Sequence, residues 1–194
     1  MVTNIKKYSV GSPIQAPVEA LSILISRSGI KAADVESIEV RVPGFGVVNN
    51  RMMPDINLQY CIAATMLDGG LSFQAAHDYA RMQDADIVRM MKRLSVVEDV
   101  SLRREETSRT ARVTVKLRDG RSLSELVTAV PGTAQNPMTT EQVTAKCRDI
   151  VLDPLQGQQL VAQSIVGAVR IFRSANDRKI QISQQANAIV HADK

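Results

Sequence analysis

The sequence is poor in aromatic residues and has no block of basic ones. Aromatic side chains make up 3% of the 194 residues, none of them is Trp, and 24 Lys plus Arg against 20 Asp plus Glu leave a net charge of +4. Proteins that bind single-stranded nucleic acid need aromatic side chains for stacking, and other nucleic-acid binders show a basic stripe. Because charges of both signs are mixed along this chain, we expect no nucleic-acid partner.

Histidine and cysteine are also scarce. The chain has two histidines, His77 and His191, and two cysteines, Cys61 and Cys147. These are too few for a zinc site made by this chain alone, and the cysteines lack a CxxC partner, so we predict buried free thiols. The sequence contains no G-x-S-x-G, Walker A or H-E-x-x-H motif. We therefore predict neither a metal nor a cofactor.

Long hydrophobic runs are missing as well. No segment reaches the length of about 18 apolar residues that a membrane span requires. The first residues, "MVTNIKKYSVGSP", lack the apolar core of a signal peptide. The sequence is therefore interpreted as that of a cytoplasmic protein without membrane contact.

Hydrophobic patterning predicts a mixture of helices and strands. Alternation of apolar and polar residues, as in "ESIEVRV", is typical of a strand with one wet face, and helical spacing marks other segments. We expect strands within 36–42, 93–102, 111–120 and 121–130. We expect helices from Ser12 to Gly29 and within 56–68, 72–82, 84–94, 139–151 and 157–172.

Turn and capping residues suggest how these elements connect. Asp119-Gly120 suits a tight hairpin, and the three later strands are expected to form an antiparallel meander joined by strand 36–42. Ser12 and Thr139 each begin a capping-box pattern, although Pro17 leaves the first helix start open as far as Ala16. The predicted fold class is α+β, with a small antiparallel β-sheet packed against several α-helices.

One N-terminal constellation suits an anion. Lys6 and Lys7 precede Gly11, which allows close backbone approach, and Ser12, where a helix would direct unpaired N–H groups outward. A carboxylate is the expected ligand. The alternative is that the lysines are solvated and that Ser12 is only a helix cap.

Tyr60 is the second candidate. It lies in "PDINLQYCIAATMLDGG", an apolar run that predicts a buried helix, and it follows an Asn and a Gln. Its hydroxyl is either hydrogen-bonded inside the core or directed into a cleft, where it does chemistry. The residue types alone leave both interpretations open.

Six segments taken in order resemble the C-terminal part of the MmgE/PrpD family. They cover the chain from about Ile5 to about Phe172 and read "IKKYSVGSPIQAPVEAL", "DVESIEVRV", "NNRMMPDINLQYCIAATMLDG", "FQAAHDYARMQDADIV", "LRDGRSL" and "GTAQNPMTTEQVTAK". That family includes 2-methylcitrate dehydratase, cis-aconitate decarboxylase and iminodisuccinate epimerase. The resemblance implies a large helical N-terminal domain, a smaller α+β C-terminal domain and an active site in the cleft between them.

This chain resembles the second domain alone. The resemblance divides it into a segment like the family's interdomain crossover at 1–12, the α+β domain at 13–175 and a weakly structured tail at 176–194. The family's catalytic histidines lie in the helical domain, so a helical MmgE/PrpD domain or subunit is the implied partner. An uncovered partner-facing surface also favours a homodimer.

The resemblance assigns catalytic roles to Lys6 and Tyr60. Lys6 matches the lysine that opens the family's "K-(R/K)-(F/Y)" stretch, and Tyr60 matches the tyrosine of its "(S/N)-L-x-Y" turn. Lys7, Ser12 and Arg51 are the expected substrate-binding residues. Gly11 stands where some members carry a histidine, which leaves the reaction open.

The expected function is that of the C-terminal domain or subunit of an enzyme acting on a small di- or tricarboxylate, most simply as a 2-methylcitrate dehydratase-like lyase. Decarboxylation and epimerisation are the other reactions that the family implies, and the chain alone is expected to be inactive. The alternative is a non-catalytic assembly or binding module, or a truncated relic of the family.

Overall fold

The computed structural model describes residues 4–103 and 109–152. The chain divides into two compact units, Met1–Lys146 and Cys147–Lys194, and the fold described below is that of the first together with the end of the last described helix, which continues into the second. The predicted helix at 157–172 and the predicted tail at 176–194 lie outside the described residues.

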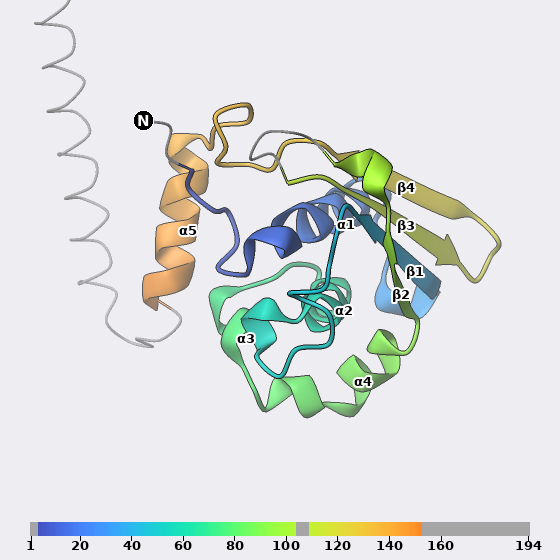
Figure 1. The fold of residues 1–194 in the computed structure, drawn as a ribbon. Helices are drawn as coiled ribbons and strands as arrows, with labels where there is room; N and C mark the ends of the chain where they lie inside the picture. The colour runs from blue at the N-terminus through green and yellow to red at the C-terminus, as the bar shows by residue number, and fades with distance from the viewer. Residues whose placement is uncertain (1–3, 104–108, 153–194) are drawn as a thin grey trace, which may run out of the picture. The chain divides into compact units, whose positions relative to one another are not determined.

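A four-stranded sheet with the order β2-β1-β3-β4 forms one layer (Figure 1). Its strands are β1 (Val35–Val42), β2 (Leu94–Glu98), β3 (Ala111–Leu117) and β4 (Ser122–Val127). The β3–β4 hairpin turns at Asp119-Gly120, as predicted, and Gly120 has a φ of 85° there. The α+β fold class is thus confirmed.

The strand pairing differs from the predicted antiparallel meander. β2 pairs in parallel with β1, at registers such as Val40 with Val96, and the sheet is therefore mixed. The connection between β1 and β2 contains the helices α2, α3 and α4. A connection of this length allows β2 to run in the same direction as β1. Strand periodicity carries no information about the direction of a partner, and for this reason the sequence did not predict the parallel pair.

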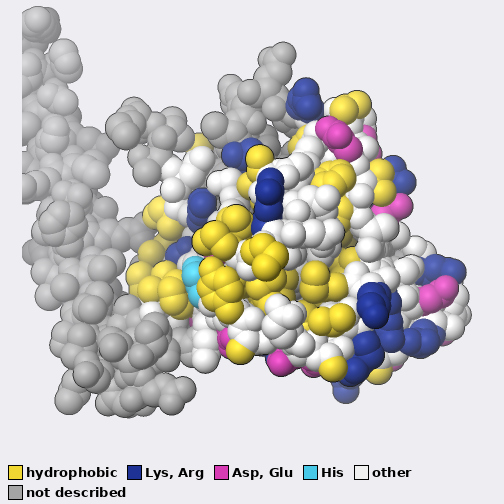
Figure 2. Space-filling view, turned by 60° about the horizontal axis from the view of Figure 1, so that its bottom comes forward, with side chains coloured by type: hydrophobic (Ala, Val, Ile, Leu, Met, Phe, Trp, Pro, Cys, Tyr) yellow, Lys and Arg dark blue, Asp and Glu magenta, His cyan; other side chains and the backbone are white. Residues whose placement is uncertain are grey.

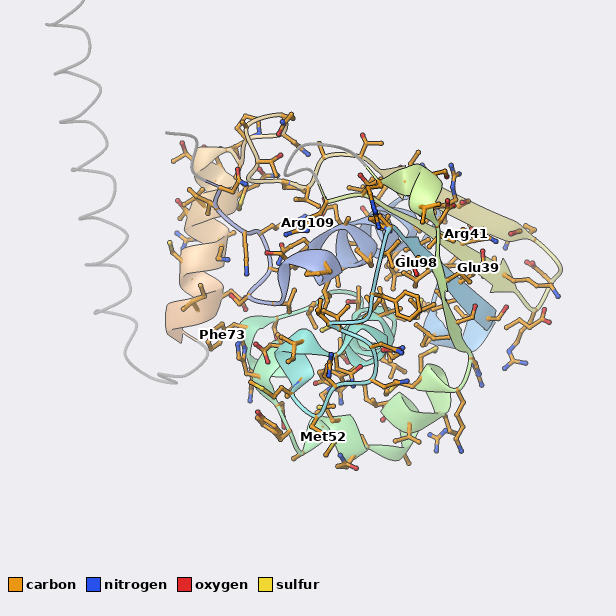
Figure 3. All side chains as sticks on the ribbon, viewed as in Figure 1. Glu39, Arg41, Met52, Phe73, Glu98 and Arg109 are labelled. Carbon is orange, nitrogen blue, oxygen red and sulfur yellow. The ribbon has the colours of Figure 1, made fainter. Side chains whose placement is uncertain are left out.

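Helices cover one face of the sheet. α1 (Gln15–Ser28) packs on β3, β4 and α2 (Leu58–Asp68), and the central strands bury alternate residues on that side, for example Val113 and Val115. The other face is polar, with Glu39 and Arg41 of β1 among its side chains (Figure 3). The Nε atom of Arg41 lies 2.6 Å from Glu39 Oε1.

The first helix begins later than its capping signal predicted. Ser12–Ile14 form a 3₁₀ turn with Gly11 in the cap position, and no side chain caps either this turn or α1. Pro17 is accommodated in the first turn of α1, where its missing N–H would have no intrahelical partner. α1 ends at Gly29, as predicted, with a left-handed φ of 64°.

Three shorter or later helices complete the described fold. α3 (Phe73–His77) is capped by Ser72, as predicted, but it stops well before residue 82 because the chain extends at Asp78 and then enters a 3₁₀ turn. α4 (Ala85–Met91) precedes β2. α5 (Thr140–Leu152) begins with the predicted capping box, in which Thr139 Oγ1 accepts from Gln142 N at 3.2 Å. No helix within 4–103 or 109–152 is long and apolar enough to cross a membrane.

Candidate functional site

The polar residues at the start of α2 hold the loop that precedes the helix. Asn57 Oδ1 accepts from Tyr60 N at 2.8 Å and caps α2, while Asn57 Nδ2 donates to the carbonyl of Arg51 at 2.6 Å. The buried Gln59 donates to Asn49 Oδ1 at 2.6 Å and accepts from Asn50 N at 3.0 Å. The amides in this apolar helix therefore anchor the loop at 43–57.

Tyr60 lies fully buried in α2. Its side chain has no exposed surface, and its hydroxyl donates to the carbonyl of Ala75 in α3 at 2.5 Å. Burial, followed by the neighbouring Cys61, raises the pKa of Tyr60 above that of an exposed tyrosine. The hydroxyl therefore has a core partner in this structure, and its catalytic role stays a prediction.

The segment Lys6–Val10 is fastened along one face of α1. Gln15 Nε2 donates to the carbonyls of Tyr8 at 2.8 Å and Val10 at 3.2 Å, and Gln15 Oε1 accepts from Tyr8 N at 3.2 Å. One turn later, Glu19 Oε2 accepts from Lys7 Nζ at 2.7 Å and from the Tyr8 hydroxyl at 2.6 Å. Gln15 and Glu19, four residues apart on one face of the helix, thus both bind Tyr8 and between them also hold Lys7 and Val10.

These contacts distinguish the two predicted lysines. The side chain of Glu19 is 11% exposed, and its carboxylate engages Lys7, which is 31% exposed. Burial and the charge of Glu19 raise the pKa of Tyr8, so the phenol remains a donor to the carboxylate. Lys6 is exposed, and among the residues that the structure describes its ammonium contacts the carbonyl of Val10 at 3.3 Å. Of the two ammonium groups, that of Lys6 is therefore the one without a carboxylate partner among the described residues.

The beginning of the N-terminal segment is held by the turn before α5 and by a residue of α5. Ile5 N donates to the carbonyl of Gly132 at 2.9 Å, and Lys146 donates to the carbonyl of Lys6. Gly132 has a φ of 92°, and a Cβ there would lie 1.6 Å from the carbonyl oxygen of Ile5. Only glycine fits this close approach. The signature "GTAQNPM" thus positions the N-terminal segment as well as preceding a helix.

The segment also contacts the loop that carries Arg51. Gly11 N donates to the carbonyl of Asp55 at 2.8 Å, and a Cβ at Gly11 would lie in ordinary contact with Ile56 and Val48. Arg51 is exposed; its Nε and Nη2 atoms donate to the carbonyls of Val47 at 3.1 Å and Gly46 at 2.7 Å. Lys6, Lys7, Ser12 and Arg51 therefore come from two segments that adjoin, whereas the Tyr60 hydroxyl points to α3.

Beside Arg51 lies a groove of about 380 Å³. We call it the methionine groove; its lining residues are Asn50, Arg51, Met52, Asn57, Met82, Gln83, Val88, Met91 and Lys92. Of the predicted site residues, Arg51 lines it, and Lys6, Lys7, Ser12 and Tyr60 do not. Lys92 follows α4, and nothing in the sequence distinguished it.

Among the residues that it describes, the structure assigns no catalytic contact to the cysteines or to His77, which were not predicted as site residues. Cys61 is a buried free thiol, as predicted, and burial raises its pKa, whereas Cys147 is free but only partly buried. His77 is exposed, stacks on Phe73 and lies 2.8 Å from the carbonyl of the same residue. Within the described part of the chain, no group of three metal-binding side chains occurs.

A comparison with family models matches residues 8–170 to the MmgE/PrpD C-terminal domain. A comparison with curated proteins finds none that matches. The family match spans most of the chain and includes the loop with Arg51 and the whole sheet; it begins at Tyr8, so Lys6 and Lys7 lie outside it. The chain therefore belongs to the MmgE/PrpD family and carries its C-terminal domain.

Proposed function

We propose that this chain supplies the carboxylate-binding wall of an MmgE/PrpD-type enzyme that acts on a small di- or tricarboxylate. The observation that carries the proposal is the exposed ammonium of Lys6, on a segment held on both sides by α1 and Gly132 and adjoining the loop with Arg51. A 2-methylcitrate dehydratase-like reaction is the simplest member of this class of activity.

The chemistry needs a cation at this position. Removing a proton next to a carboxylate, or losing carbon dioxide, builds negative charge that a donor or cation must stabilise. The ammonium of Lys6 would meet that charge, and Arg51 would hold a second carboxylate. Because Lys7 is bound by Glu19, we assign to it the support of the segment rather than the contact with substrate.

The remaining catalytic groups would come from a helical MmgE/PrpD domain. The two histidines of this chain are His77, whose ring contacts the carbonyl of Phe73 in its own helix, and His191, which lies outside the described residues. An acid/base pair is therefore expected from the helical MmgE/PrpD partner. Tyr60 would join the chemistry only if binding of this partner released its hydroxyl from Ala75. The homodimer expected from the sequence remains a prediction.

A non-catalytic binding module is the second candidate. The contact between the Tyr60 hydroxyl and Ala75 favours it, because a hydroxyl that already donates in the core needs no substrate as a partner. Such a module would bind its partner without binding a carboxylate ligand at Lys6.

Calorimetry with cis-aconitate and 2-methylcitrate separates the two candidates. We expect saturable heat with the wild-type chain and a loss of affinity of about tenfold or more in Lys6→Ala, because a charged hydrogen bond is worth about 1.5–3 kcal/mol. Arg51→Ala is expected to weaken binding less. Lys116→Ala, which removes an exposed lysine on β3 that pairs with Glu36 at 3.0 Å, is the matched control. An absence of heat, or an equal loss in the Lys116 control, would count against the carboxylate site.

A further inference from the structure

Exposed apolar side chains gather on one face of the described chain. Seven large hydrophobic side chains are exposed in the described residues, and four of them, Val47, Met52, Met53 and Val88, belong to the loop at 43–57 or to α4. Met52 is 85% exposed. Figure 2 shows hydrophobic side chains collected over this face. Single exposed apolar residues need no explanation, but a contiguous patch marks an interaction site.

The methionine groove lies within this face. Met52, Met82 and Met91 line it together with Val88, and methionine side chains adapt to irregular apolar partners. The loop on one side of the groove is already ordered, because Asn57 and Gln59 hold Arg51, Asn49 and Asn50 in place. A ligand would therefore cause little further ordering of the loop, which favours binding.

The groove carries charge of one sign. Arg51 and Lys92 line it, and no Asp or Glu does. Lys92 is exposed and forms no side-chain hydrogen bond or ion pair within 4–103 and 109–152. The guanidinium of Arg51 is fixed by the carbonyls of Gly46 and Val47. The complementary surface is apolar with carboxylates at its edges.

We propose that the methionine groove binds an amphipathic helix of a partner protein, with apolar side chains in the groove and carboxylates beside Arg51 and Lys92. A helix bound in a groove buries apolar side chains at intervals of three and four residues and therefore makes a long contact. Such a contact would also cover Val47 and Met53, the exposed apolar side chains of the loop beside the groove. A small carboxylate would leave those side chains in water. In a two-fold dimer built on this face, the cations of the two copies would meet without a carboxylate in the groove to separate them.

The test uses the full 194-residue chain with ¹³C-labelled methionine methyl groups. The probe is a synthetic helical peptide with Leu on one face and Glu on its flanks, and the control peptide has Lys in place of Glu. The acidic peptide is expected to shift the methyl signals of Met52, Met82 and Met91. The signals of the buried Met66 and Met90, which do not line the groove, should stay in place.

Two variants test the two kinds of contact. Lys92→Glu is expected to weaken the acidic peptide by about tenfold and to favour the basic one, because it reverses a charge at the groove. Lys116→Glu makes the same change on β3, away from the groove, and should leave both affinities unchanged. Val88→Ser removes an exposed apolar contact and should weaken either peptide several-fold without unfolding the chain.

Three results would overturn the proposal. They are equal binding of both peptides, shifts confined to other methionines, and shifts of Met52, Met82 and Met91 that follow the concentration of the chain alone, which would identify a second copy as the occupant. Peptide binding is measured without turnover. If the acidic peptide does not bind, only the proposal for the methionine groove is contradicted. The calorimetry with Lys6→Ala remains a separate test of the carboxylate site.

Discussion

Tyr60 illustrates how much a single residue depends on its surroundings. The sequence places it in a buried helix beside polar residues, and both a core and a cleft interpretation follow from that pattern. In the structure its hydroxyl donates to Ala75, while the neighbouring polar residues Asn57 and Gln59 hold a loop. Asn57 and Gln59, at the start of this helix, therefore hold the loop, and they do not form a polar site around the Tyr60 hydroxyl.

Replacing this hydroxyl has an effect on stability that depends on pH. Tyr60→Phe is expected to lower the free energy of unfolding near neutral pH by about 1 kcal/mol, because the buried carbonyl of Ala75 loses its short hydrogen bond and keeps only the one from Asp78 N at 3.4 Å. Above a pH of about 10 the unfolded tyrosine ionises, whereas the folded one, with its raised pKa, stays protonated. The wild type then loses stability that the variant does not, and the difference between them shrinks.

Urea unfolding followed by circular dichroism at neutral and alkaline pH measures this difference. Tyr79→Phe, at a position that is 58% exposed, is the control and should be neutral near pH 7. A Tyr60→Phe variant as stable as the wild type at neutral pH would mean that the contact with Ala75 is not maintained in solution.

At the scale of elements, α1 does more than cover the sheet. One of its faces packs on β3 and β4, and another presents Gln15 and Glu19 to the N-terminal segment. The hydrophobic pattern of α1 predicted the first of these roles. The second role depends on a segment that has no regular secondary structure, so no periodicity marked it.

The Glu19 contacts are expected to contribute more than an exposed ion pair does. Glu19→Gln removes the charge that faces Lys7 and should lower the free energy of unfolding by about 2 kcal/mol, because the partly buried ammonium loses its carboxylate. Glu36→Gln breaks the exposed pair with Lys116 and should cost less than about 0.5 kcal/mol.

Urea unfolding and amide hydrogen exchange at Tyr8 and Val10 report the two effects. Faster exchange in Glu19→Gln alone would agree with an anchored segment. Equal behaviour of the two variants would show that burial adds nothing to the contact between Glu19 and Lys7.

At the scale of the whole molecule, the chain carries the C-terminal domain of the MmgE/PrpD family, and the function proposed for it depends on a helical partner domain. We expect the chain alone to show no turnover of 2-methylcitrate or cis-aconitate, because its histidines offer no acid/base pair. Mixing with a helical MmgE/PrpD domain should restore turnover, and Lys6→Ala should abolish most of it.

An assay of product formation over a series of mixing ratios measures this reconstitution. Activity that saturates near one helical domain per chain is the expected result. A mixture that binds but turns over neither acid would favour the non-catalytic module instead.

Sequence patterns alone predicted most of the elements, because each depends on local chemistry. Alternation identified β1, Asp119-Gly120 identified the β3–β4 hairpin, and the capping box at Thr139 identified the start of α5. The predicted cap at Ser12 was wrong, since Gly11 takes that position and the chain first forms a 3₁₀ turn. Local signals predicted where elements lie, but they did not predict how the strands pair.

Tertiary structure alone decided the rest, because it depends on contacts between residues far apart in the sequence. The parallel pairing of β1 with β2 follows from three intervening helices. The difference between Lys6 and Lys7 follows from Glu19, twelve residues after Lys7. The methionine groove is lined by residues of the loop at 43–57 and of α4. Hydrophobic periodicity does not predict contacts between segments so far apart in the sequence. The sequence thus determined the family, the fold class and the residue types, while packing decided which of their polar groups remain available to a ligand.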